Sequence, residues 1–253
     1  MIRKSKKSQV TIFIILALII VVSIILLFLL IKKPQFQIED IENPQAYIDS
    51  CTREFTEEAI NILSEQGGDI NPEGSTMFRG RNITYLCYNA NFYEPCIMQR
   101  PDLITHIENE ITGYIEPKVD NCFNALKTKL ESKNYDIEIG NMQLQTELQT
   151  GKVVINIDRD FKMTKREETR SFDNFKSIIA NPINDLAEVA MEIANQEAKY
   201  CNFDTLGYMI FYPDYDLDKF RPGDGDVIYQ LRHIQTNKRF MIAIRSCALP
   251  PGF

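Results

Sequence analysis

An uncharged, apolar run near the N-terminus constrains this chain more than any other feature of its sequence. Residues 10–31 are 22 consecutive positions without a charge, and only Thr11 and Ser23 among them are polar. A helix of this length, rising roughly 1.5 Å per residue, is about 33 Å long and can cross a hydrocarbon core of about 30 Å. A helix buried inside a domain rarely runs so far without an amphipathic stripe. The sequence therefore predicts a transmembrane helix over residues 10–31.

The flanks of this run predict that it is retained and which way it points. A cleaved secretory signal has an apolar region of about 7 to 15 residues and a small-x-small cut site. This run is longer and continues into Lys32-Lys33-Pro34. Four basic residues precede it, within residues 1–9, and two follow it. Because cytoplasmic ends of spans collect Lys and Arg, we expect a chain in the cell membrane with a cytoplasmic head at residues 1–9 and everything beyond the span outside the cell.

Charge is divided unevenly along the chain. The first 33 residues hold six basic and no acidic side chains, which leaves 22 basic and 35 acidic residues in the rest. Binding to nucleic acid needs basic patches that displace counterions. The acidic body argues against a nucleic-acid partner, so the expected partners are the lipid bilayer and other surface proteins. No oligomeric state is predicted.

All six cysteines follow the apolar run, and they are Cys51, Cys87, Cys96, Cys122, Cys201 and Cys247. An even number on the oxidising side of an anchor favours disulfides. No two cysteines form a CxxC pair and the chain has only two histidines, so a zinc site has little support. The alternative is that some cysteines are free, buried thiols, which pack as small hydrophobes.

Local patterns favour three particular pairs of cysteines. Cys87 and Cys96 bracket a short, turn-rich stretch. Cys51 and Cys122 each lie on an apolar face of a predicted helix, so the two helices could be joined. This leaves Cys201, at the end of a helix, with Cys247, at the end of the last predicted strand.

Beyond a linker at residues 32–43, the sequence predicts an α+β domain at residues 44–253. Three Pro residues at positions typical of helix starts and a helical period of apolar side chains predict helices at 44–66, 101–132 with a kink or break at Pro117, and 182–200. Alternation of apolar and polar side chains predicts an amphipathic hairpin at 142–163, a returning strand after it, and further strands near 206–212, 227–234 and 240–246. This order predicts helices covering one face of an antiparallel sheet, with 177–181 as the seam if there are two domains.

One acidic tract has the spacing of a calcium site. Asp214, Asp216 and Asp218 alternate as the first three ligands of a calcium-binding loop do. The sixth position of such a loop needs Gly for a sharp turn, and here it is Lys219. A solvated acidic loop between strands is the better interpretation, and no metal or other cofactor is predicted.

The remaining polar motifs point to no catalytic centre. Neither His106 nor His233 is accompanied by a Ser, Cys or Asp motif of a catalytic triad, and no GxSxG, Walker loop or HExxH occurs. No catalytic or cofactor-binding residue is therefore predicted. Asn82-Ile83-Thr84 is a glycosylation sequon on the part of the chain expected outside.

The N-terminal stretch KKSQVTIFIILALII resembles the class III signal sequences of archaeal type IV pilin-like surface proteins. Lys6-Lys7, Ser8 and Gln9 match the basic pair, the small residue and the Gln that surround the cut in those sequences. The resemblance implies cleavage between Ser8 and Gln9 by a prepilin-type peptidase on the inner face. It also implies that the apolar helix stays on the mature protein. The resemblance covers about the first 31 residues.

These features predict a single-pass, membrane-anchored cell-surface protein with a structural, adhesive or complex-forming role. One alternative is a pilin-like or pseudopilin-like subunit that assembles through its apolar N-terminal helix. A second alternative is an anchored, outward-facing enzyme or ligand-binding domain.

Overall fold

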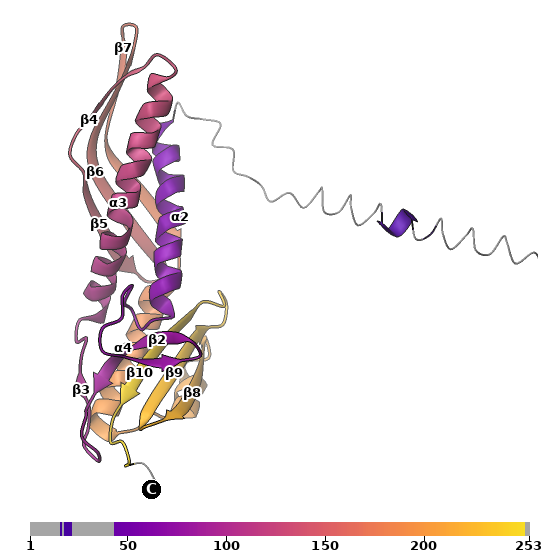
Figure 1. The fold of residues 1–253 in the computed structure, drawn as a ribbon, viewed down its shortest axis with the longest axis vertical. Helices are drawn as coiled ribbons and strands as arrows, with labels where there is room; N and C mark the ends of the chain where they lie inside the picture. The colour runs from indigo at the N-terminus through magenta and orange to yellow at the C-terminus, as the bar shows by residue number, and fades with distance from the viewer. Residues whose placement is uncertain (1–15, 17, 22–42, 251–253) are drawn as a thin grey trace, which may run out of the picture. The chain divides into compact units, whose positions relative to one another are not determined.

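The computed structural model describes residues 16, 18–21 and 43–250 (Figure 1). The expected head, most of the expected span, the linker up to residue 42 and the Ser8–Gln9 bond lie outside the described residues. Leu16 and residues 18–21 are helical and exposed. No helix among the described residues is long and apolar enough to cross a membrane. Residues 40–253 form a compact unit of their own.

This unit contains four helices and ten strands among its described residues, which confirms the α+β class. The helices are α2 (Pro44–Ser64), α3 (Leu103–Glu131), α4 (Ile183–Tyr200) and α5 (Thr205–Phe211). The strands are β1 (Ser75–Phe78), β2 (Arg81–Tyr88), β3 (Ile97–Met98), β4 (Asp136–Ile139), β5 (Gln143–Gln149), β6 (Lys152–Lys165), β7 (Glu168–Ala180), β8 (Tyr215–Gly223), β9 (Asp226–His233) and β10 (Arg239–Arg245).

The first sheet is antiparallel and is built around the long strand β6. β4 and β5 pair with one edge of β6, and β7 pairs with the other. The predicted hairpin is confirmed: Leu148 lies opposite Val153, and Gly151 supplies the positive φ of 70° that the turn requires. Figure 1 shows α2 and α3 side by side against this sheet.

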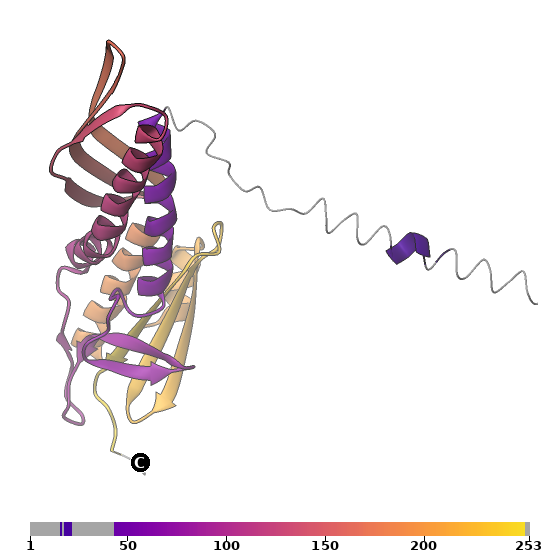
Figure 2. The same cartoon turned by 45° about the horizontal axis from the view of Figure 1, so that its top comes forward.

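The second sheet is mixed, so the expectation of a purely antiparallel sheet is wrong for this part of the chain. Its strand order is β1-β2-β10-β9-β8, and β3 pairs with β2. β2 runs parallel to β10. Parallel strands need a long connection, and the chain between these two strands is long enough to supply it. In Figure 2 the purple β1 and β2 lie beside the yellow and orange strands of this sheet. α4 packs against β2, β9 and β10 and also contacts the first sheet.

The first two predicted helices are confirmed, with one correction. Asn43 caps α2 by accepting a hydrogen bond from the backbone N–H of Ala46 at 3.2 Å. α3 runs through Pro117 without the expected break. Proline removes one helical hydrogen bond, but Ile115 and Val119 on either side are fully buried, and this continuous apolar face keeps the helix together.

The expectation that a proline is the first residue of each helix is correct for α2, but α3 and α4 begin one or two residues after their prolines. Pro44 is the first residue of α2, whereas Pro101 and Pro182 lie just before α3 and α4. Asn181 still acts as a capping side chain, because it accepts a hydrogen bond from the N–H of Ile183 at 3.1 Å. Residues 177–181 are the end of β7 and its connection to α4, and they lie inside the single compact unit.

The prediction of a strand near residues 206–212 is wrong, because this segment forms helix α5. Asp204 accepts a hydrogen bond from the N–H of Gly207 at 3.0 Å and so caps the helix. The alternating apolar residues imitate a strand, yet Leu206 and Ile210 are 70% and 77% exposed. The next strand, β8, begins only at Tyr215.

Three disulfides join all six cysteines, in the same pairs that the sequence favours: Cys51–Cys122, Cys87–Cys96 and Cys201–Cys247. The first ties α2 to α3, the second closes the loop between β2 and β3, and the third ties the end of α4 to the end of β10. Stable disulfides are typical of oxidising compartments. The disulfides therefore indicate an exported or extracellular domain.

Candidate functional site

The three carboxylates of the acidic tract contact three different partners. Asp216 pairs with Arg232 on the neighbouring strand, and Asp218 accepts a hydrogen bond from Gln230 at 3.4 Å. Asp214 instead accepts one from Gln235 at 3.2 Å. Across the described residues, no group of three or more His, Cys, Asp or Glu side chains could hold a metal ion. The three carboxylates thus brace the β8–β9 hairpin one by one.

The glycosylation sequon lies at the start of β2. Asn82 is exposed, as a modified asparagine must be, and Ile83 is fully buried. Thr84 is also buried, and its hydroxyl donates a hydrogen bond to Asp69 at 2.7 Å. The sequon therefore shares a residue with a polar cluster under the second sheet.

This cluster centres on Asp69, a buried carboxylate that the sequence analysis did not single out. Besides Thr84, the ring of His106 hydrogen-bonds to Asp69, and Arg100 forms an ion pair with it at 3.4 Å. Burial acts to raise the pKa of Asp69, but the hydrogen bonds from His106 and Thr84 and the charge of Arg100 outweigh it and lower the pKa. Asp69 is therefore ionised at neutral pH.

His106 thus has an Asp partner that its sequence neighbourhood does not reveal, because the two residues are 37 positions apart. The turn after α2 provides the geometry: Gly67 and Gly68 have φ of 80° and 98° and carry the chain around to Asp69. Among the described residues, His106 has no hydroxyl or thiol partner, and Thr84 already donates to Asp69. The cluster is a bracing network and not a catalytic triad.

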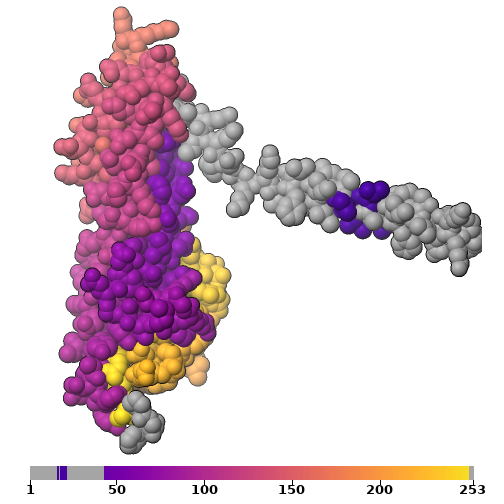
Figure 3. Space-filling model, viewed as in Figure 1, coloured from indigo at the N-terminus to yellow at the C-terminus, as the bar shows by residue number. Residues whose placement is uncertain are grey.

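A hollow of about 420 Å³ opens next to this cluster. It is bordered by side chains from three segments: the turn before β1, strand β2, and the residues after β3. The side chains are Glu73, Ser75, Tyr85, Tyr88, Gln99 and Arg100. Its size falls within the usual range for small-molecule sites, about 300 to 1,000 Å³. In Figure 3 the magenta surface of α3 and the purple surface of the segment that contains β1 and β2 adjoin each other on one face.

A β-bulge brings the two tyrosines of the hollow together. Side chains three residues apart on a regular strand point to opposite faces. Here the pairing between β10 and β2 shifts by one residue between Tyr85 and Cys87. Consequently the rings of Tyr85 and Tyr88 lie with their centroids 4.8 Å apart. Bulges often re-aim side chains next to functional sites.

Two buried carboxylates, Asp69 and Asp226, bind side chains that border the hollow. Asp69 holds the guanidinium of Arg100, as described above. Asp226, which is 8% exposed, accepts a hydrogen bond from the hydroxyl of Tyr85 at 2.8 Å. Burial raises the pKa of Tyr85, and the hydrogen bond to Asp226 adds to this effect, so the phenol stays protonated. The ring and the guanidinium therefore have fixed positions.

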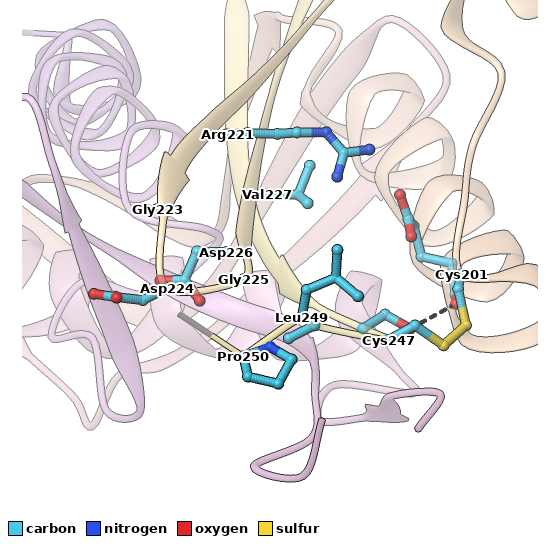
Figure 4. A pocket seen from close by; sticks show the side chains of 13 residues that line it. Cys201, Arg221, Gly223, Asp224, Gly225, Asp226, Val227, Cys247, Leu249 and Pro250 are labelled. Atoms are coloured by element: carbon cyan, nitrogen blue, oxygen red, sulfur yellow. Dashed lines mark hydrogen bonds between the residues drawn. A yellow bond between two sulfur atoms is a disulfide. The ribbon is translucent and has the colours of Figure 1, made fainter. Parts of the chain in front are cut away.

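A second pocket, of about 480 Å³, lies near the C-terminal end of the described chain (Figure 4). The Cys201–Cys247 disulfide borders it, and Glu197, Arg221, Asp224 and Asp226 are the charged residues of its lining. Glu197 is 1% exposed and accepts hydrogen bonds from Tyr229 and, at 3.2 Å, from Lys219. Glu197, the most deeply buried charged group of this lining, is thus already paired, and among the described residues no aromatic ring lines this pocket as Tyr85 and Tyr88 line the hollow.

The sequence analysis named none of the residues that form the hollow. They come from separate loops and strand ends. The only local signals for a surface feature are the turn residues around Gly74 and the aromatic residues of β2. No protein-family model matches the chain, and no curated protein is similar to it.

Proposed function

We propose that this chain is a single-pass, membrane-anchored cell-surface protein with an adhesive or complex-forming role. Residues 1–9 would lie in the cytoplasm, residues 10–31 in the bilayer, and residues 44–253 outside. One observation carries the proposal: all six cysteines form disulfides in the unit that follows the uncharged run. Disulfides need an oxidising compartment, and the run has the length of a membrane span.

Helix α5 supports the complex-forming part of this proposal. Leu206, Ile210 and Phe211 are 70%, 77% and 80% exposed on it, and Tyr212 follows them at 53%. Exposed apolar patches on a folded domain mark interaction surfaces. The hollow at Tyr85 and Tyr88 adds a concave surface that suits an adhesive role.

Cysteine labelling of intact cells tests the proposed topology. Ser132→Cys places a thiol at an exposed position after α3, and Ser5→Cys places one in the basic head. A membrane-impermeant maleimide should label Ser132→Cys on intact cells and Ser5→Cys only after the membrane is opened. The reverse pattern, or labelling of neither variant before the membrane is opened, would contradict the proposal.

The residues around Ser8 support a second candidate, a pilin-like or pseudopilin-like subunit. In that case the chain is cut between Ser8 and Gln9 and assembles through its apolar helix. The intact mass of the protein extracted from its own membrane decides between the two. Loss of residues 1–8 supports the pilin-like subunit, whereas a complete N-terminus excludes it.

A further inference from the structure

We infer that the hollow formed by Tyr85, Tyr88 and Arg100 binds a neutral carbohydrate, one or a few pyranose units of a surface polysaccharide. The inference deepens the adhesive role and rests on the proposed function for its biological setting. The binding itself depends only on the described residues. It can therefore be measured on purified protein, independently of which side of the membrane the domain occupies.

The aromatic side chains supply the first half of the chemistry. A pyranose ring has apolar C–H faces that pack on aromatic rings, and its edges carry hydroxyl groups. Tyr88 is 36% exposed and Tyr85 is half-buried, so both rings present surface to the hollow. Their interplanar angle of 54° makes an angled floor and not a flat stack. Such a floor cradles a bulky, non-planar ring better than it does a flat aromatic ligand.

The polar side chains supply the second half. Arg100 donates hydrogen bonds, Glu73 accepts them, and Gln99 and Ser75 do both. A sugar hydroxyl is both donor and acceptor, so it can form a hydrogen bond with any of these side chains. The Nε–H of Arg100 is buried and has no hydrogen-bond partner among the described residues. This buried group does not face a ligand, but the two Nη atoms of Arg100 donate only once each, to the carbonyl of Gln99 and to Asp69, and the side chain is 28% exposed, so further N–H groups remain for a ligand.

Charge decides between a neutral and an anionic ligand. The ion pair with Asp69 already compensates the positive charge of Arg100. Glu73 adds a negative charge at the exposed rim of the hollow. A carboxylate or phosphate on the ligand would therefore meet no net positive charge.

Pre-organisation favours a real binding site over a surface depression. Asp226 fixes Tyr85, Asp69 fixes Arg100, and the Cys87–Cys96 disulfide closes the loop that begins next to Tyr88. The backbone N–H of Tyr85 also donates to the carbonyl of Gly74 at 3.1 Å, which ties the rim to the floor. A ligand would lose little affinity to ordering of these groups on binding.

Binding of oligosaccharides to the full chain tests the inference. The protein is purified in a polyoxyethylene detergent, because a sugar-based detergent would compete for the site. Maltohexaose, cellohexaose and chitohexaose are the neutral probes, hexagalacturonate is the anionic probe and choline the cationic probe. We expect at least one neutral probe to bind with Kd on the order of 1 mM or tighter by saturation-transfer NMR and calorimetry. Binding of none of the three, or tighter binding of hexagalacturonate or choline, overturns the inference.

Variants locate the binding. Tyr88→Ala should weaken it roughly tenfold, because Tyr88 supplies the more exposed ring of the floor. Tyr200→Ala is the matched control, since Tyr200 is 63% exposed on α4 and does not border the hollow. Gln99→Ala gives a second variant that leaves both rings in place and should also weaken binding. Unchanged affinity in Tyr88→Ala and Gln99→Ala, with the fold verified by thermal unfolding, would place any sugar binding elsewhere and overturn the inference.

Discussion

The four-stranded sheet, β4 to β7, and the six-stranded sheet, β1 to β3 with β8 to β10, bury charge in different ways. The first buries one charged side chain, Arg159, which is 7% exposed. It donates to Asp120 at 2.7 Å and to the carbonyl of Gly140 at 3.1 Å, and it lies 4.7 Å from the ring of Phe123. All its contacts stay inside this half of the molecule, so it ties α3 to the sheet.

The second sheet and its neighbours bury three carboxylates, and each of them supports a surface hollow. Asp69 holds Arg100, Asp226 holds Tyr85, and Glu197 lies in the wall of the C-terminal pocket. Burying a charge costs free energy unless it is well paired. The comparison indicates that the half with the four-stranded sheet is stabilised mainly by packing. In the half with the six-stranded sheet, buried carboxylates cost some free energy of folding and hold surface side chains in place.

The largest change in the free energy of unfolding is expected in the core of the half with the four-stranded sheet. Phe123 is fully buried, with ring centroids 5.0 Å from Phe175 and 6.1 Å from Phe161. Phe123→Ala should lower the free energy of unfolding by about 4 kcal/mol, because it removes a large side chain and leaves a cavity. Urea unfolding measures the change. Phe172→Ala, at the half-buried rim of the same cluster, should cost much less, and equal costs would contradict the packing account.

A smaller change in the free energy of unfolding, which should depend on pH, is expected for the buried carboxylates of the half with the six-stranded sheet. Asp69→Asn should cost about 2 kcal/mol at neutral pH, because it weakens three contacts of a buried carboxylate. Asp216→Asn is the control, since its ion pair with Arg232 is more than a third exposed and should contribute less than about 1 kcal/mol.

The sign of the pH dependence follows from the lowered pKa of Asp69. Its stabilisation is complete above the pKa of an unfolded Asp, roughly 4, and is lost as the pH falls through the lower pKa of the folded state. The wild-type protein should therefore lose stability below about pH 4 more steeply than Asp69→Asn. Parallel curves for the two proteins would show that Asp69 is not the responsible group.

The smallest effect is expected at the acidic tract. Asp218→Asn should change the free energy of unfolding by less than about 0.5 kcal/mol, because Asp218 is exposed and accepts a single long hydrogen bond from Gln230. Calcium should leave the Tm of the wild-type protein unchanged. A calcium-dependent rise in Tm that Asp218→Asn abolishes would mean that the three carboxylates converge on a cation after all.

Local sequence signals account for the first half of the molecule. The Asn43 cap of α2, the apolar alternation along β6 and the turn at Gly151 each act over a few residues. They account for the helix that starts at residue 44 and for the hairpin within residues 142–163, both of which the sequence predicts. Arg159 follows the same alternation and is buried together with Ile157 and Phe161. Periodicity is a reliable guide there because burial on one face dominates.

The second half depends on contacts between distant residues, and the sequence did not reveal them. Strands β1 and β3, with four and two residues, are too short for a clear period, and the bulge interrupts the period of β2. β2 also finds its partner β10 about 160 positions later. The Asp69–His106 contact and the bulge that aligns Tyr85 with Tyr88 likewise exist only in the folded chain. α5 was missed because its cap, Asp204, competes with an apolar alternation typical of a strand.

Non-reducing peptide mass mapping of the protein taken from its own membrane tests the central claim most directly. An exported, membrane-anchored domain should yield three linked peptide pairs: Cys51 with Cys122, Cys87 with Cys96, and Cys201 with Cys247. Free thiols at most of these positions would contradict the claim, because they would place the domain in a reducing compartment.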